Sequence, residues 1–126
     1  MLKIIVLISG SGSNLQAIID ACNAKIINGC VVGVISNKAN AYGLERAKKN
    51  NIPTNVINHN NFTTREGFDK ELVNSINIFQ PDLIVLAGFM RILSPIMTSV
   101  FKNKMINIHP SLLPKYPGLN THEQVI

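Results

Sequence analysis

Residues 9–14, Ser-Gly-Ser-Gly-Ser-Asn, have the composition of a loop that binds a phosphate. Glycines let a backbone approach a ligand closely, and serine hydroxyls add hydrogen-bond donors. The loop follows an aliphatic run and precedes a helical pattern, so the unpaired amides at the start of that helix would face the same ligand. A tight strand-to-helix turn without a ligand is the simpler alternative, but such a turn does not require three serines.

This loop differs from the common nucleotide-binding motifs. No Gly-Lys-Ser/Thr follows it, and Leu15 stands where the dinucleotide fingerprint has its third glycine. The second predicted strand ends in Ser36-Asn37-Lys38, without the acidic residue that would hold a ribose hydroxyl. These differences favour a phosphate monoester. Because Lys38 could hold the extra phosphate of NADP, an NADP-dependent oxidoreductase is the alternative.

Asn107 and His109 form the second candidate for chemistry. Two residues apart at the end of an apolar run, they would point to one face of a strand, at the carboxyl end where open α/β sheets bind ligands. Asparagine can donate to an oxygen that gains negative charge, and histidine can transfer a proton near neutral pH. Acyl transfer to an amine needs both functions. A purely structural histidine is the alternative.

The other histidines, His59 and His122, are expected to be exposed to solvent. The three histidines have neither helical nor clustered ligand spacing, which predicts no metal site. Cys22 and Cys30 also lack a metal or redox spacing, as is typical of reduced thiols in a cytoplasmic protein.

Alternating apolar runs and helical patterns predict the elements that position these residues. Strands are expected at 3–8, 30–36, 54–57, 83–87 and 105–108, and helices at 13–22, 41–50, 63–80 and 95–101. This order predicts an α/β fold with an open, mostly parallel sheet in a three-layer αβα arrangement. Thr63 and Glu66 have capping-box spacing, and Ser94-Pro95 fits an N-cap followed by a proline. Residues 121–126 have the pattern of a further helix start.

Composition narrows the class of protein. The chain has 126 residues, 46% of them hydrophobic, which suits a single domain over residues 1–126. No apolar run approaches the ~20 residues of a membrane span. The net charge is +5, but the basic residues are scattered and no aromatic residues interleave with them. We therefore expect neither a membrane nor a nucleic-acid partner.

Three segments of the chain are similar to a known enzyme family. Residues 9–17 (SGSGSNLQA), 87–93 (AGFMRIL) and 107–118 (NIHPSLLPKYPG) resemble the phosphoribosylglycinamide formyltransferases, which are folate-dependent enzymes of purine synthesis. The resemblance extends over all 126 residues. The wider formyl-folate family includes methionyl-tRNA formyltransferases, but these have a different opening loop and an arginine-rich proline segment. Lys-Tyr-Pro-Gly at 115–118 therefore favours the first group.

The resemblance implies a reaction and a set of site residues. The formyl group of the cosubstrate 10-formyltetrahydrofolate would pass to the amine of glycinamide ribonucleotide on the route to IMP, without a metal. Gly12, Ser13 and Asn14 would bind the ribonucleotide phosphate. The implied folate-binding residues are Arg65, Met90, Arg91, Ile92, Leu93 and Asn107. Asn107 would also stabilise the oxyanion, and His109 would be the general acid.

One departure from the family concerns its catalytic aspartate, which lies beyond the proline-rich loop. Only Glu123 is acidic after His109 in this chain. We therefore expect that the C-terminal third of the family is absent, with part of the folate-binding loop and the closing strands. The chain would then be either an active formyltransferase or a catalytically incomplete ligand-binding fragment. A homodimer is compatible with the sheet edge that would be left exposed.

Overall fold

The computed structural model describes residues 1–91, 93–108 and the backbone of residues 124–125. In chain order the elements are β1 (Leu2–Ile8), α1 (Ser13–Asn23), β2 (Gly29–Ser36), α2 (Gly43–Lys49), β3 (Thr54–Val56), the 3₁₀ turn η1 (His59–Asn61), α3 (Arg65–Phe79), β4 (Leu83–Ala87), α4 (Pro95–Val100), β5 (Met105–Ile108) and β6 (Gln124–Val125). The strands form one sheet in the order β3-β2-β1-β4-β5-β6. The pairs among the first five strands are parallel, and β5 pairs with β6 antiparallel.

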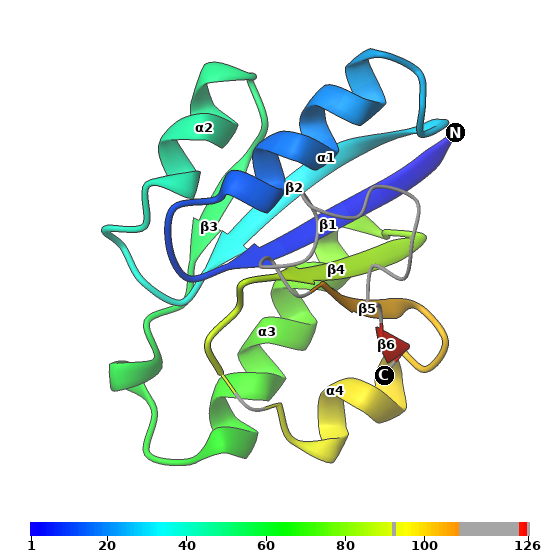
Figure 1. Ribbon diagram of the computed structural model, residues 1–126. Helices are drawn as coiled ribbons and strands as arrows, with labels where there is room; N and C mark the ends of the chain where they lie inside the picture. The colour runs from blue at the N-terminus through cyan, green and yellow to red at the C-terminus, as the bar shows by residue number, and fades with distance from the viewer. Residues whose placement is uncertain (92, 109–123, 126) are drawn as a thin grey trace.

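Helices cover both faces of this sheet, α1 and α2 on one face and α3 and α4 on the other (Figure 1). The alternation of side chains along β1 explains the two layers of core, because neighbouring residues of a strand point to opposite faces. Ile4, Val6 and Ile8 pack in the cluster under α1 and α2. Ile5 and Leu7 belong to the cluster under α3 and α4. The predicted three-layer αβα fold is confirmed.

The helix starts show which local signals were interpreted correctly. Ser94 caps α4, since its hydroxyl accepts from the amide of Ile96, and Pro95 occupies the first turn as predicted. The capping box expected at Thr63 and Glu66 is wrong. Thr64 is the N-cap of α3, and its hydroxyl accepts from the amide of Gly67 at 3.0 Å. Adjacent threonines offer the same chemistry, and only the backbone conformation decides which one caps the helix.

The helix start predicted at 121–126 is also wrong. Residues 124–125 form β6, with backbone partners Ile106 and Asn107 in β5. The edge of β5 offers unpaired backbone groups, and pairing with them stabilises an extended chain where the isolated sequence pattern suggested a helix. Among the described residues, no helix is both long and apolar enough to cross a membrane.

The strand order creates a natural position for a ligand. β1 lies between β2 and β4. After β1 the chain adds β2 and β3 on one side of it, and then crosses to add β4 and β5 on the other side. Helices on opposite faces follow the two strands, which opens a crevice at their carboxyl ends. The loop at residues 9–14 and the segment after β4 meet there (Figure 1).

Candidate functional site

A cavity of about 290 Å³ lies at the carboxyl ends of β1 and β4. Residues 9–14 form one wall, with Ala87, Gly88 and Met90 opposite and Lys38 beside them. The three predicted phosphate-binding residues are thus brought together, and a lysine joins them. The first turn of α1 contains no acidic side chain that could occupy the positive end of its dipole. This end of the sheet suits an anion.

A larger cavity, about 420 Å³, lies at the amino ends of β1 and β2 and has no charged side chain in its lining. Cys22 and Cys30 both border it. Burial, and then the neighbouring Cys30, raise the pKa of the Cys22 thiol. A raised thiol pKa makes the reactive thiolate scarcer. We therefore assign the ligand to the smaller cavity, whose lining carries the donors.

Gly12 determines the path of the loop. It is the N-cap of α1 in the left-handed region, at φ 76°. A Cβ on Gly12 would stand 2.6 Å from Cα of Gly43, at the start of α2. The absence of a side chain therefore lets two helix starts touch, and does not make room for a phosphate. By contrast, a Cβ on Gly10 would meet no atom of residues 1–91 or 93–108 within 4 Å.

The loop carbonyls are held by donors of the protein. The amide of Gly43 donates to the carbonyl of Gly10 at 3.0 Å, and the amide of Gln16 donates to that of Gly12 at 2.8 Å. Between them, Nε of Arg46 donates to the carbonyl of Ser11 at 2.7 Å. The amides of residues 10–14 have no acceptor in the part of the chain that the structure describes. The loop therefore offers donors to a ligand while its carbonyl oxygens are occupied.

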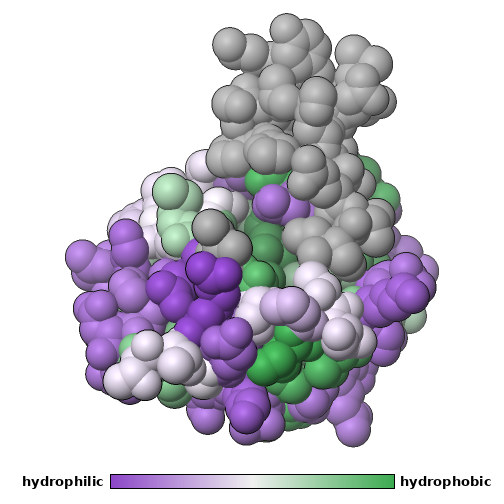
Figure 2. Space-filling view, turned by 90° about the horizontal axis from the view of Figure 1, so that it is seen from below, coloured by the Kyte–Doolittle hydropathy of each residue, from purple (hydrophilic) through white to green (hydrophobic). Residues whose placement is uncertain are grey.

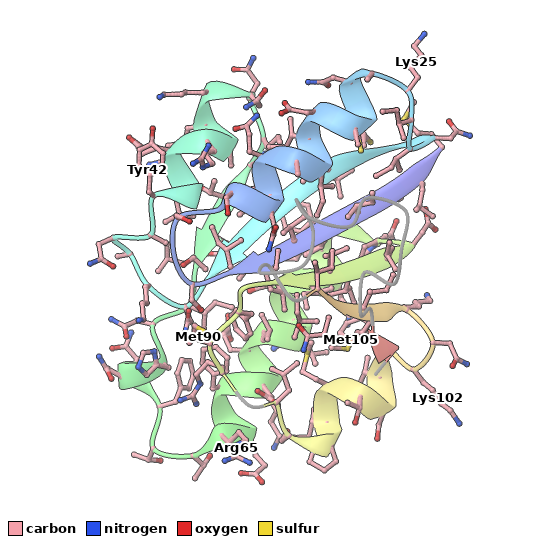
Figure 3. The ribbon with its side chains drawn as sticks, in the orientation of Figure 1. Lys25, Tyr42, Arg65, Met90, Lys102 and Met105 are labelled. Carbon is pink, nitrogen blue, oxygen red and sulfur yellow. The ribbon has the colours of Figure 1, made fainter. Side chains whose placement is uncertain are left out.

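The segment after β4 is attached at both ends to buried oxygens. The amide of Met90 donates to Oγ of Ser9 at 2.7 Å. The amide of Ser94 donates to Oδ2 of Asp69, a fully buried residue of α3. Met90, whose amide forms the first of these two anchors, is 75% exposed (Figure 3).

An aromatic cluster lies beneath the same segment. Phe68 stacks with Phe89 at 6.5 Å and meets Phe62 edge-on at 5.8 Å. The guanidinium of Arg91 lies 4.9 Å above the Phe68 ring, within the range of a cation–π interaction. Nε of Arg91 is buried and has no partner among the described residues. This donor could meet an acceptor on a ligand.

The remaining predicted residues divide into three groups. Asn107 lies in β5, half-buried and in register with Leu86 of β4, so it borders the carboxyl end of the sheet. Arg65 is exposed in the first turn of α3, outside the lining of the phosphate cavity (Figure 3). Ile92, His109 and His122 lie outside the described residues, so the shared face of Asn107 and His109 stays a prediction.

One histidine was misjudged from the sequence, and three positioning residues were missed. His59 is half-buried, and its buried Nδ1 has no partner in the described part of the chain, so its expected exposure was wrong. The missed residues are Gly43, Arg46 and Asp69. Asp69 stands at a buried position of the helical pattern, and a carboxylate there is itself a signal of function or anchoring. Gly43 and Arg46 had no signal beyond their residue type, and Ser9 was placed in the loop without its role as an acceptor for Met90.

Residues 2–126 match the model of the formyl transferase family. The chain belongs to this family. It is 56% identical over 125 residues to a phosphoribosylglycinamide formyltransferase of Escherichia coli, which covers 99% of this chain and 59% of that protein. It is 47% identical to part of the human trifunctional purine biosynthetic protein adenosine-3, over 98% of this chain and 12% of that protein.

Solved structures of the formyl transferase family have the same fold. Glycinamide ribonucleotide transformylase 1 of Symbiobacterium toebii superposes with a TM-score of 0.84 at 45% identity, over 96% of this chain and 57% of that one. The phosphoribosylglycinamide formyltransferase of Coxiella burnetii gives 0.82 at 55% identity, with the same coverage. The chain thus spans about three-fifths of the length of these bacterial relatives.

Proposed function

We propose that this chain forms the ribonucleotide-binding part of a phosphoribosylglycinamide formyltransferase. Such an enzyme would transfer the formyl group of 10-formyltetrahydrofolate to the amine of glycinamide ribonucleotide in purine synthesis. The observation that carries the proposal is the loop at residues 10–14, whose amides border the cavity without acceptors in the described part of the chain. The names of the relatives support formyl transfer over an NADP-dependent reaction or a methionyl-tRNA acceptor.

The phosphate of the ribonucleotide would sit against Gly12, Ser13 and Asn14. The helix start supplies unpaired amides and a positive dipole end, and Lys38 adds a full charge to the lining. Gly10 and Ser11 contribute amides while their carbonyl oxygens are held away by α2. A dianionic phosphate would thus meet donors from several directions.

The segment after β4 fits a flat, partly apolar molecule with polar edges, which is the chemistry of a pterin. Seen from below, hydrophobic residues reach the surface among hydrophilic ones (Figure 2). Met90 would cover one face of the ring, and the unpartnered Nε of Arg91 could donate to an edge. Leu93, partly buried against the core, and Ile92 would complete the pocket. Arg65 would reach a more distant part of the folate.

The acyl transfer itself would use Asn107 and His109. As the amine attacks the formyl carbon, negative charge grows on the formyl oxygen, and the Asn107 amide would donate to it. His109 would supply the proton that the departing nitrogen of the folate requires. A carboxylate near the histidine would raise the pKa of its imidazolium. No aspartate follows His109 in this sequence.

We keep five narrower statements as predictions. The chain is expected to be a single domain over residues 1–126, to act in the cytoplasm, and to have no nucleic-acid partner. A homodimer is the expected assembly if the chain is an oligomer. The reaction is expected to need no metal.

The decisive experiment measures formyl transfer by the purified chain, given both substrates. In parallel, calorimetry measures the binding of glycinamide ribonucleotide. Binding with turnover supports an active enzyme, and binding without turnover supports a ligand-binding fragment. Lack of ribonucleotide binding by the folded chain would refute the proposal.

The role of His109 is tested by His109→Ala in the transfer assay. We expect turnover to fall at least about 100-fold, which is the rate contribution typical of a general acid, and the affinity for the ribonucleotide to stay nearly unchanged. His59→Ala is the matched control, because His59 lies in η1, outside the lining of the phosphate cavity. Equal activity of the His109→Ala and native chains would contradict the assignment. If the native chain binds the ribonucleotide without turnover, the same two substitutions are compared at the equivalent positions of the Escherichia coli relative.

A further inference from the structure

Ser9 occupies the junction of three strand ends. It follows β1 directly and is 4% exposed. Its Oγ lies 2.6 Å from Oδ1 of Asn37, the residue after β2, and 2.7 Å from the amide nitrogen of Met90, beyond β4. Asn37 is itself 2% exposed. One hydroxyl of a nearly buried residue therefore connects the carboxyl ends of β1, β2 and β4.

The direction of these hydrogen bonds is fixed by chemistry. A hydroxyl has one proton to donate, and Oδ1 of Asn37 can only accept. The Ser9 proton therefore points to Asn37, which leaves its lone pairs for the amide of Met90. Such a chain orders its members more strongly than an isolated bond, because each donation polarises the next group.

The backbone near Met90 depends on this bond. Gly88 takes φ 74°, and no heavy atom of the described residues lies within 4 Å of the place that a Cβ would occupy on it. No described group therefore restrains the chain on the Cβ side of Gly88. Two residues later, the Met90 amide meets Ser9. At the far end of the segment the Ser94 amide meets Asp69, which belongs to α3 and not to the phosphate loop.

We propose that Ser9 is a positioning residue that fixes the backbone of Met90 relative to the phosphate-binding loop, and so couples the two ligand sites. The proposal rests on the proposed function, which assigns a phosphate to one side and a folate to the other. Ser9 begins the loop, and the carbonyl of the next residue, Gly10, is held by Gly43. A ligand that immobilises the loop therefore immobilises the acceptor of the Met90 amide.

The test compares amide hydrogen exchange in the native chain and in Ser9→Ala. We expect the Met90 amide to exchange at least 10-fold faster in the variant, while the amide of Val6, in the centre of β1, reports global stability. Ser75→Ala is the matched control, because Ser75 is also buried and its hydroxyl accepts from Asn55 at 3.1 Å. Like Ser9→Ala, this substitution removes one buried hydroxyl, but that hydroxyl belongs to α3 and its hydrogen bond is to Asn55. Met90 exchange that changes no more than Val6 exchange would overturn the proposal.

The coupling is tested by adding glycinamide ribonucleotide. In the native chain, binding should slow Met90 exchange at least threefold beyond any change at Val6. In Ser9→Ala the ligand should still shift the Gly12 amide resonance but leave Met90 exchange unaffected. Equal slowing in both proteins would overturn the proposal, as would slowing in neither while Gly12 responds.

Failure of the proposed function has a separate signature. If the Gly12 amide resonance does not move in the native chain, the loop does not bind the ribonucleotide and the proposed function fails. The exchange comparison without ligand then still decides whether Ser9 positions the Met90 backbone. If Ser9→Ala does not fold, Ser9→Cys replaces it, because a thiol nearly preserves the shape and forms only weak hydrogen bonds. The same 10-fold increase at Met90 is expected there, and native-like protection would overturn the proposal.

Discussion

The two walls of the candidate site are held in different ways. The loop after β1 is fixed mainly by backbone contacts, since Gly12 touches Gly43 and the carbonyl of Gly10 accepts from the amide of that same residue. The segment after β4 is held by side chains distant in sequence. Ser9 lies 81 residues from Met90, and Asp69 lies 25 residues from Ser94. Backbone contacts thus fix the proposed phosphate wall, residues 9–14. Side-chain acceptors, which a substitution can remove, hold the proposed folate wall, the segment from Gly88 to Ser94.

This difference predicts how each wall fails when it is altered. A change in the glycine contact should damage the fold, because the obstacle is backbone that cannot move aside. A change in a side-chain acceptor should loosen one segment and leave the rest of the sheet intact. The following substitutions test this contrast, from the largest expected effect to the smallest.

Gly12→Ala should have the largest effect. The new Cβ would stand 2.6 Å from Cα of Gly43, and the left-handed backbone adds its own penalty. Together these terms should lower the free energy of unfolding by about 2–4 kcal/mol. Urea unfolding followed by circular dichroism measures it. Gly10→Ala is the control, because a Cβ there meets no atom of the described residues within 4 Å, and the substitution should lower the free energy of unfolding by less than about 1 kcal/mol. Equal losses would break the contrast.

Asp69→Ala should have an intermediate effect on stability and a local effect on structure. It leaves the Ser94 amide without its acceptor, which costs roughly 1–3 kcal/mol for a buried donor. Amide exchange should accelerate at Ser94 and not at Gln16, the first hydrogen-bonded turn of α1. Asp20→Ala serves as the control, since Asp20 is exposed and its carboxylate accepts, among the described residues, from Gln16 alone. Uniform acceleration throughout the chain would show that Asp69 supports the whole fold.

Arg46→Ala should have the smallest effect, and it tests whether the phosphate wall depends on any side chain at all. The substitution removes the hydrogen bond to the Ser11 carbonyl, which contributes about 1 kcal/mol. If that bond stabilises the loop in its ligand-bound form, the affinity for the ribonucleotide should fall roughly fivefold. Calorimetry with glycinamide ribonucleotide measures it. Lys48→Ala is the control, because Lys48 lies on the same helix and, in the described part of the chain, forms its one ion pair with exposed Glu45. A loss above about 100-fold would mean that Arg46 contacts the ligand itself.

Most of the architecture was predictable from local pattern. Continuous aliphatic runs such as residues 3–8 predict buried parallel strands, and the helical spacing of residues 15, 18 and 19 predicts the face of α1 that is buried. The serine and glycine content of residues 9–14 likewise indicated the loop that lines the cavity. These features depend on residues close together in the sequence, so one amino-acid sequence is enough to predict them.

The errors arose where distant segments decide the outcome. β6 is extended because an edge of β5 is available to it. Gly12 was read as space for a ligand, but the group that needs the space is Gly43 on the next helix. The acceptor role of Ser9 depends on Met90, and no periodicity relates those positions. Such contacts follow from the three-dimensional arrangement alone.

The contact between Gly12 and Gly43 is asymmetric, because a Cβ added to each glycine would meet a different kind of atom. The difference determines which substitutions a selection experiment can recover. A Cβ on Gly43 would lie 2.4 Å from Cδ1 of Ile8, the tip of a side chain, and at the longer distance of 3.1 Å from Cα of Gly12. A second mutation, Ile8→Val, would remove that tip, so alanine at position 43 should be reachable in two steps. The obstacle at position 12 is the main chain, and no compensating substitution can delete it. A library selected for ribonucleotide binding should therefore return paired changes at 8 and 43, and only glycine at 12.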